Sequence, residues 1–278
     1  MKKMLTAAGL LVFLLGGLAA AQKTLVPILS LQVDDTEKGK KVTYGYLLGG
    51  IQNGRFLTAK TAAARLKGDR NFSLVDLGTP LKGAFSFGAL QKGGEFCEDA
   101  YYYMPEIDAV GTVAIGAGAG WTLTPRSVKT ASLTDNGSKK AVADALKLKG
   151  LAKSPVEIKQ AFEADLDGDG ADETVLIAHH LAPDADERPA GGSYSLVMVR
   201  KKTGAKTANI LVGGSFPRKT DDYFDGEYKL AGIVDLNGDG KMELVVEVWG
   251  YEENWVQVYR LTAGKPSVIK ELTYYCGV

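Results

Sequence analysis

The sequence has few of the residues on which most catalytic and zinc-binding signatures depend. It contains two histidines, His179 and His180, and two cysteines. No Cys/His cluster supports a zinc site, and no G-x-S-x-G segment marks a nucleophile of the hydrolase type. The histidines are adjacent at the end of a predicted strand, so their side chains should point to opposite faces. We expect them to have a structural or surface role.

Long hydrophobic runs are also lacking, except at the N-terminus. Lys2 and Lys3 precede an apolar stretch over 5–18, and three alanines follow at 19–21. This order predicts a signal peptide over residues 1–21, because the stretch is too short for a span of about 20 residues. We therefore expect an exported protein, in the periplasm, at the cell surface or secreted, with no membrane span after cleavage.

No excess of charge of either sign is present. The chain has 33 basic and 33 acidic residues. Removing the signal peptide takes away only Lys2 and Lys3, so the balance barely changes. A near-neutral chain gives no basis for binding nucleic acid or an anionic membrane surface.

The two cysteines, Cys97 and Cys276, are widely separated in the sequence. In an exported protein such a pair favours a disulfide. This bond would tie the middle of the chain to its last residues. The alternative is two free, buried thiols.

Strand patterns dominate what is present and predict a mainly β fold of antiparallel meanders with two short helices in the N-terminal half. Asn53-Gly54 separates two apolar runs, which is typical of a β-hairpin. One helix is expected over 58–68, capped by Thr58. The other is expected over 138–150, with Ser138 as its N-cap and Gly150 as its stop.

An internal repeat occupies the C-terminal half. Residues 156–181 align with 226–251 at an offset of 70, and 196–202 align with 256–262 at an offset of 60. An extra loop at 182–191 in the first copy accounts for the difference. Each copy predicts a strand, an acidic loop and three further strands, and the two meanders should pack together through their apolar faces.

The repeat also suggests how the chain divides. The predicted segments are the signal peptide, a β-rich N-terminal region (22–135), a helix and linker (136–154), and two repeats (about 155–220 and 221–278). Whether the N-terminal region forms its own domain or completes the sheets of the repeats is left open by the sequence.

The acidic loops of the two copies share one spacing: an acid at position 1, an acid or amide at 3, an acid at 5, glycine at 6 and an acid at 9. Hard cations such as Ca²⁺ bind six to eight oxygen ligands, and alternate residues of a turning loop can aim oxygens at one centre. A backbone carbonyl at position 7 can add a ligand. The predicted ligands are Asp165, Asp167, Asp169, Ala171 and Glu173 in the first loop and Asp235, Asn237, Asp239, Lys241 and Glu243 in the second.

These loops differ from an EF-hand, which needs a glutamate at position 12 and flanking helices. Position 12 is Leu176 or Val246, inside a predicted strand. The segments "DLDGDGADETVL" and "DLNGDGKMELVV" resemble instead the calcium turn of FG-GAP or VCBS repeats, D-x-[DN]-x-D-G-x-x-[DE]. Over about 155–278 this resemblance implies calcium at the matched positions and antiparallel sheets like propeller blades. It implies no reaction.

The whole chain also resembles exported bacterial proteins of this repeat type. The shared features include the strand "YSLVMVRK" and the ending Cys276-Gly277-Val278. This resemblance carries over no activity.

The alternative to a metal loop is a metal-free turn, because Asp, Asn and Gly are ordinary turn residues. Four carboxylates in the first loop would repel one another without a counter-ion, which favours a cation. The first loop carries one more carboxylate than the second. On that count it should bind Ca²⁺ more tightly.

Two hypotheses of function follow. The first is a non-catalytic, calcium-stabilised β-repeat protein that binds or scaffolds an unknown protein or glycan of the cell envelope. The second is a secreted hydrolase with glycans as its candidate substrates, with structural calcium and with acid–base carboxylates among its acidic loops. The sequence does not decide whether the protein is an enzyme.

Overall fold

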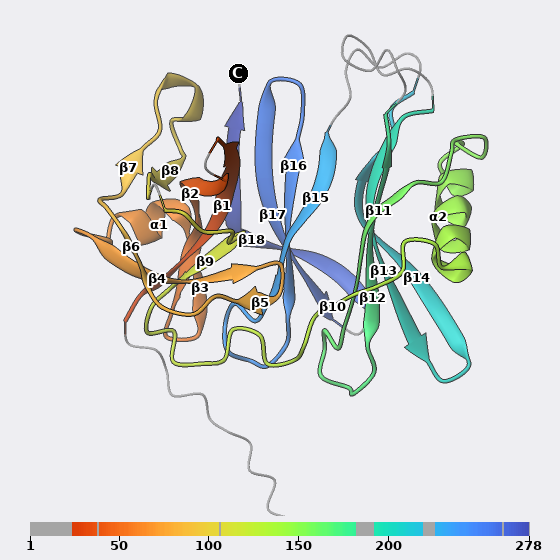
Figure 1. Cartoon of the computed structure of the whole chain (residues 1–278), viewed down its shortest axis with the longest axis horizontal. Helices are drawn as coiled ribbons and strands as arrows, with labels where there is room; N and C mark the ends of the chain where they lie inside the picture. The colour runs from red at the N-terminus through yellow and green to blue at the C-terminus, as the bar shows by residue number, and fades with distance from the viewer. Residues whose placement is uncertain are drawn as a thin grey trace, which may run out of the picture.

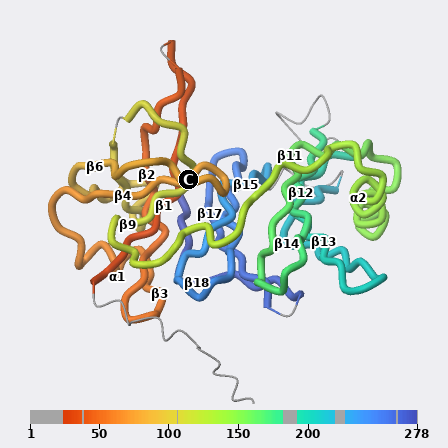
Figure 2. Tube along the Cα trace, turned by 60° about the horizontal axis from the view of Figure 1, so that its bottom comes forward, coloured from red at the N-terminus to blue at the C-terminus, as the bar shows by residue number. Residues whose placement is uncertain are grey.

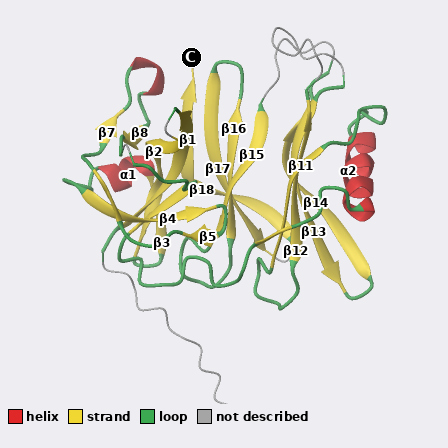
Figure 3. Cartoon of the chain, in the orientation of Figure 1, coloured by secondary structure: helices red, strands yellow, loops and turns green. Residues whose placement is uncertain are grey.

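The computed structural model describes residues 24–37, 39–105, 107–181, 192–218, 226–262 and 264–277. The predicted signal peptide, the extra loop at 182–191 and Val278 lie outside these residues. Within them the protein is mainly β, with antiparallel sheets and two α-helices, which confirms the predicted fold class (Figures 1 and 3).

The N-terminal sheet contains nine strands. Its main path has the order β5-β4-β9-β1-β2-β8-β7, with β3 paired to β2 and β6 paired to β4. The short helix α1 (Ala59–Ala63) and the 3₁₀ turn η1 (Glu95–Cys97) belong to the same region. The strands are β1 (Val26–Thr36), β2 (Gly39–Gln52), β3 (Arg55–Thr58), β4 (Arg70–Asp76), β5 (Thr79–Pro80), β6 (Phe85–Phe87), β7 (Gln91–Lys92), β8 (Tyr101–Tyr103) and β9 (Val113–Gly116).

Each repeat forms its own antiparallel meander, as predicted. The first-repeat sheet has the order β10-β11-β12-β13-β14, and the second-repeat sheet has the order β15-β16-β17-β18. Helix α2 (Asn136–Leu148) precedes the first meander. The strands are β10 (Lys129–Thr130), β11 (Ile158–Ala164), β12 (Glu173–His180), β13 (Tyr194–Thr203), β14 (Lys206–Ser215), β15 (Glu227–Val234), β16 (Glu243–Trp249), β17 (Glu253–Thr262) and β18 (Lys265–Gly277).

The sheets are stacked in layers, with the second-repeat sheet in the middle (Figure 1). One buried cluster joins the two repeat sheets and includes Ile177 and Val246. A second cluster joins the second-repeat sheet to the N-terminal sheet and includes Ile28 and Val245. Helix α2 covers the outer face of the first-repeat sheet through residues such as Val142. The N-terminal region therefore has its own sheet but shares a core with the second repeat.

Layering explains why the central strands are apolar on successive residues. In β16, Val245 faces the N-terminal sheet while its neighbours Leu244 and Val246 face the first-repeat sheet. Successive residues of a strand point to opposite faces, so a strand that is buried on both faces needs apolar side chains at every position. A strand that is buried on one face needs them only at every second position. The valine-rich stretches of the repeats follow from this position in the stack.

Local signals predicted the hairpin and both helices, with two differences. Gln52 pairs with Arg55 across Asn53-Gly54, as expected. Helix α1 is capped by Thr58 but is shorter than predicted, ending at Ala63. Helix α2 is capped by Asp135 and not by Ser138, because the Asp135 carboxylate accepts a hydrogen bond of 2.7 Å from the backbone N–H of Ser138.

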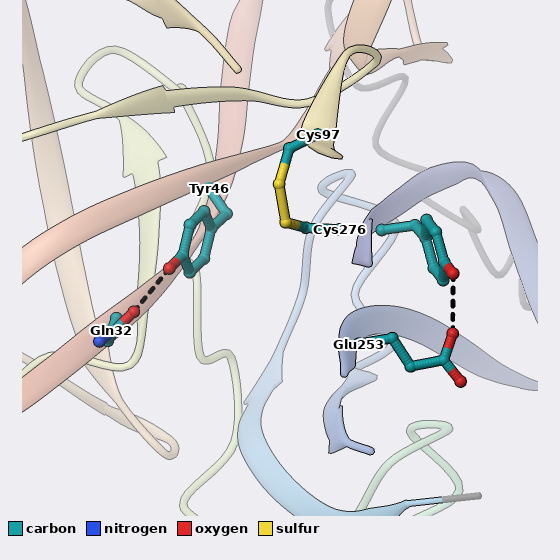
Figure 4. Close-up of a disulfide and its surroundings, with 6 residues drawn as sticks. Gln32, Tyr46, Cys97, Glu253 and Cys276 are labelled. Carbon is teal, nitrogen blue, oxygen red and sulfur yellow. Dashed lines mark hydrogen bonds between the residues drawn. A yellow bond between two sulfur atoms is a disulfide. The ribbon is translucent and has the colours of Figure 1, made fainter. Parts of the chain in front are cut away.

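Cys97 and Cys276 form a disulfide, as predicted. The bond joins the 3₁₀ turn η1 to β18, the last strand of the second repeat (Figure 4). On β18 the neighbouring Tyr275 hydroxyl donates a hydrogen bond of 2.8 Å to Glu253. The disulfide therefore fixes the N-terminal region against the edge of the second-repeat sheet.

Candidate metal site in the acidic loops

The two acidic loops occupy the same place in their sheets. The first joins β11 to β12 and the second joins β15 to β16. In each loop the acid at position 1 follows the end of one strand, and the acid at position 9, Glu173 or Glu243, is the first residue of the next. The loop therefore closes the first hairpin of each meander.

Asp165 organises the backbone of the first loop. Its carboxylate accepts hydrogen bonds from the N–H groups of Gly168 at 2.7 Å and of Asp169 and Gly170 at 3.1 Å. Gly170, at position 6, has a φ of 87°. This left-handed conformation favours glycine, and it permits the sharp bend that the spacing predicts.

Three carboxylates of the first loop converge on one centre. One oxygen from each of Asp165, Asp167 and Glu173 lies within 4.8 Å of the others. Asp165 and Glu173 are buried, and Asp167 Oδ1 is a buried oxygen without a hydrogen-bond partner in the described structure. Carboxylate oxygens are the ligands that Ca²⁺, Mg²⁺ and Mn²⁺ prefer, so this set can hold a metal ion.

Lys201, on β13, reaches into the same loop. Its ammonium group lies 2.8 Å from Asp167 Oδ2, 2.8 Å from Asp169 Oδ2 and 2.7 Å from Glu173 Oε1. Partial burial alone would lower the pKa of Lys201, but the hydrogen bonds that its ammonium donates to the three carboxylates outweigh it and raise that pKa above its usual value. The lysine is therefore held as a cation among three of the predicted metal ligands.

The second loop repeats the backbone arrangement. Asp235 accepts hydrogen bonds from the N–H groups of Gly238 at 2.7 Å and Gly240 at 2.8 Å. At positions 3 and 5 the side chains bind each other, with Asn237 donating to Asp239 at 3.0 Å. The acid at position 9, Glu243, is fully buried and accepts a bond of 3.0 Å from the N–H of Leu236.

Arg260 is the cation that faces the second loop. Its Nε and Nη2 lie 3.1 Å from Glu243 Oε1. Burial raises the pKa of Glu243 to about 7 and also raises that of Asp235, because a low-dielectric surrounding disfavours the charged form. A nearby cation offsets this cost, and Arg260 supplies one in the structure.

The strand register shows that Lys201 and Arg260 are equivalent. Thr174 pairs with Arg200 in the first repeat, and Leu244 pairs with Tyr259 in the second. Position 201 therefore corresponds to position 260, an offset of 59. The predicted offset of 60 was wrong by one residue, and it matched Arg260 with Arg200, which instead binds Asp135 at 3.0 Å.

The segment that leads from β9 to α2 runs from the N-terminal sheet to the first-repeat sheet (Figure 2). On its way it contacts both acidic loops. Arg126 donates hydrogen bonds to the carbonyl groups of Asp165 and Gly240 and thereby bridges the two loops. The loops also touch directly, since the N–H of Met242 donates to the carbonyl of Leu166 at 2.8 Å. Sequence patterns missed Arg126, Lys201 and Arg260 because all three lie far from the loops in the chain.

Trp121 supports the second loop from the same segment. Its indole N–H donates to the carbonyl of Asp235 at 2.9 Å. Gly238 has a φ of 77°, and a Cβ atom there would lie 2.9 Å from the Trp121 ring. Glycine is therefore required at position 238 both for the backbone conformation and for the contact with tryptophan.

The residues at position 7, Ala171 and Lys241, lie beside position 5. Each donates its backbone N–H to the aspartate there, Asp169 or Asp239, at 2.9 Å. Metal binding by their carbonyl oxygens stays a prediction.

The two histidines lie apart from the loops. His180 Nδ1 is 2.7 Å from Glu157, and His179 Nδ1 is 3.3 Å from Glu227. Each histidine thus contacts a different glutamate, in agreement with side chains that point to opposite faces of β12.

Glu247 is an acid of the second repeat that lies outside its loop. It faces the N-terminal sheet and accepts a hydrogen bond of 2.7 Å from the Ser30 hydroxyl. Burial raises its pKa above the usual 4.5. The folded protein then holds this proton to higher pH than the unfolded chain, so the Glu247 contribution to stability falls as the pH rises above about 4.5.

We expect Glu247→Gln to weaken this pH dependence. Glutamine keeps an oxygen to accept from Ser30 but carries no charge to bury. The gain in unfolding free energy relative to the wild type should therefore be larger at pH 8 than at pH 4, as measured by urea unfolding at both values. Glu252→Gln, on the neighbouring exposed turn, is the control. An equal effect of Glu247→Gln at both pH values would contradict the prediction.

Comparison with family models, with curated proteins and with solved structures finds no match for this chain.

Proposed function

We propose that this is an exported, calcium-stabilised β-repeat protein with a non-catalytic binding or scaffolding role in the cell envelope. The observation that carries the proposal is the convergence of Asp165, Asp167 and Glu173 within 4.8 Å, in a loop whose spacing recurs at the same place in a second sheet. The unpaired Asp167 Oδ1 gives this cluster a free acceptor for a cation.

The position of the loops supports a structural role for the ion. Each loop joins two adjacent strands, and Arg126 and the Met242–Leu166 contact connect the loops to each other. A cation bound here would neutralise carboxylates at the junction of the two repeat sheets. Ordering this junction stabilises the packing of the sheets rather than any reacting group.

One observation of the structure supports export. The protein has a disulfide, a bond typical of oxidising compartments. Among the helices that the structure describes, none is long and apolar enough to cross a membrane. The resemblance to FG-GAP and VCBS repeats and the predicted signal peptide point in the same direction.

Thermal unfolding with and without calcium tests the proposal. An ion that binds only the folded state at about 100 times its Kd adds roughly 2.7 kcal/mol, which is about 5–10 °C for a chain of this size. We expect the Tm to rise by that amount in Ca²⁺ relative to EGTA. Mg²⁺ at equal ionic strength controls for screening.

Matched variants locate the effect. Asp167→Asn combined with Asp239→Asn should abolish most of the Ca²⁺-dependent shift, because it removes an acid from each loop. Asp172→Asn changes an exposed acid that is not at a ligand position and should leave the shift intact. The proposal fails if the wild-type Tm is the same in Ca²⁺ and EGTA.

A secreted hydrolase is the second candidate, and one observation favours it. A cavity of about 690 Å³ beside the disulfide is lined by four acids, Glu95, Glu98, Asp99 and Glu271. Paired carboxylates are what glycoside hydrolysis requires. Turnover of a polysaccharide by the wild type, lost in both Glu98→Gln and Glu271→Gln, would establish this alternative.

A further inference from the structure

We propose that Lys201 is the built-in cation of the first acidic loop and that it competes with divalent metal for this loop. Its effect on Ca²⁺ affinity rests on the function proposed above, whereas its effect on the metal-free protein does not. Lys201 thereby makes the two loops unequal, although their spacing is the same.

The contacts of Lys201 place its charge at the centre of the ligand set. The ammonium lies 2.7–2.8 Å from oxygens at positions 3, 5 and 9 of the loop. A Ca²⁺ ion needs oxygens at 2.3–2.6 Å, so it would draw on the oxygens that now hold the ammonium. Lysine and metal cannot both occupy this centre.

The equivalent residue of the second loop is placed differently. Arg260 binds the acid at position 9, Glu243, from the side of β17. Positions 3 and 5 there are joined to each other by the Asn237–Asp239 hydrogen bond. Among the described contacts, no cation bridges three acids of the second loop as Lys201 does in the first.

This difference changes the expected order of Ca²⁺ affinity, which the number of carboxylates alone would set in favour of the first loop. The first loop has the higher ligand charge, but its extra acid is balanced by a lysine that is already tethered to the sheet. Metal binding there must break three charge-assisted contacts, each among the stronger hydrogen bonds in proteins. The first loop is therefore stable without metal and binds metal weakly.

Lys201→Gln tests the role directly, with Lys202→Gln as the matched control, since Lys202 is the exposed neighbour on the same strand. In EGTA we expect Lys201→Gln to lower the Tm by at least about 5 °C, because three acids lose their counter-ion. Lys202→Gln should change it little. Equal Tm values for the two variants would overturn the proposal.

Calcium titration by calorimetry, with Ca²⁺ alone as the probe, measures the competition. Lys201→Gln should bind Ca²⁺ about tenfold or more tightly than the wild type at the first loop, since no ammonium has to be displaced. Wild-type affinity in this variant would overturn the competition. If neither protein binds Ca²⁺, the proposed calcium function and the competition both fail, while the Tm difference in EGTA still decides whether Lys201 is the loop cation.

A double variant keeps the test decisive if Lys201→Gln folds poorly. Lys201→Gln with Asp169→Asn removes one charge of each sign, and Asp169 is the most exposed of the three partners. We expect the pair to regain part of the Tm lost in the single variant in EGTA. An additive loss in the double variant would show that Lys201 does not act through these carboxylates.

Discussion

Replacing Cys97 with serine should lower the free energy of unfolding by about 3–5 kcal/mol, the largest effect that we expect from a single substitution outside the core. The disulfide closes a loop with a sequence separation of 179 residues. On the chain-entropy model, cross-links over long loops restrict the unfolded chain most. The bond also joins the N-terminal sheet covalently to the second-repeat sheet, which otherwise meet through non-covalent contacts such as the Ser30–Glu247 hydrogen bond. Urea unfolding of the two proteins measures the difference.

Two controls separate the cross-link from local packing. Cys276→Ser and the double variant should lose as much as Cys97→Ser, because each removes the same bond. Reduction of the wild type with dithiothreitol should give a comparable loss. If the double variant lost clearly more than either single variant, packing of the cysteines and not the covalent link would account for the change.

Arg260→Met should destabilise the protein by about 1–3 kcal/mol at pH 8 in EGTA, because it leaves a buried carboxyl group without its cation and hydrogen-bond donor. Glu243 is fully buried, and the guanidinium of Arg260 is its ionic partner. Methionine keeps an apolar stem of similar length. Chemical unfolding at pH 8 measures the loss.

The loss should depend on pH in a defined direction. Burial raises the pKa of Glu243 from its ordinary 4.5 to about 7 in the folded protein. Removing Arg260 raises the folded value further, so the destabilisation grows as the pH rises above about 7, where the wild-type carboxyl loses its proton, and is smallest below that pH. The double variant Arg260→Met/Glu243→Gln should recover most of the stability at pH 8. A loss that is equal at pH 4 and pH 8 would argue for lost packing of Arg260, for example against Phe56.

Some features of the fold were predictable because their causes are local. Asn53-Gly54 permits the left-handed turn of a hairpin, and the structure places both residues at positive φ. Thr58 caps α1 as expected. The N-cap of α2 was misplaced because Asp135 and Ser138 are both good capping residues. In the structure Asp135 is the N-cap, and its carboxylate also forms an ion pair with Arg200.

The paired loops were also visible in the sequence, but the cations that face them were not. The spacing of acids and glycine fixes how each loop turns, since Asp165 and Asp235 bind backbone groups a few residues away. Lys201 contacts Glu173 across a separation of 28 residues. Lys201 aligns with Arg260 only once the strand pairing is known. The connection that precedes each of these residues differs in length between the two repeats, so the sequence alignment was off by one position.

The sequence alone determined the mainly β class, the two meanders, the five-position loops and the availability of a cysteine pair, because each depends on residues close together or on a simple period. The tertiary structure decided the layering of three sheets, the closure of the disulfide, the Arg126 bridge and the placement of Lys201 among three acids. These depend on which strand faces which, and that is set by burial of both faces of the central sheet and by pairing register over long separations.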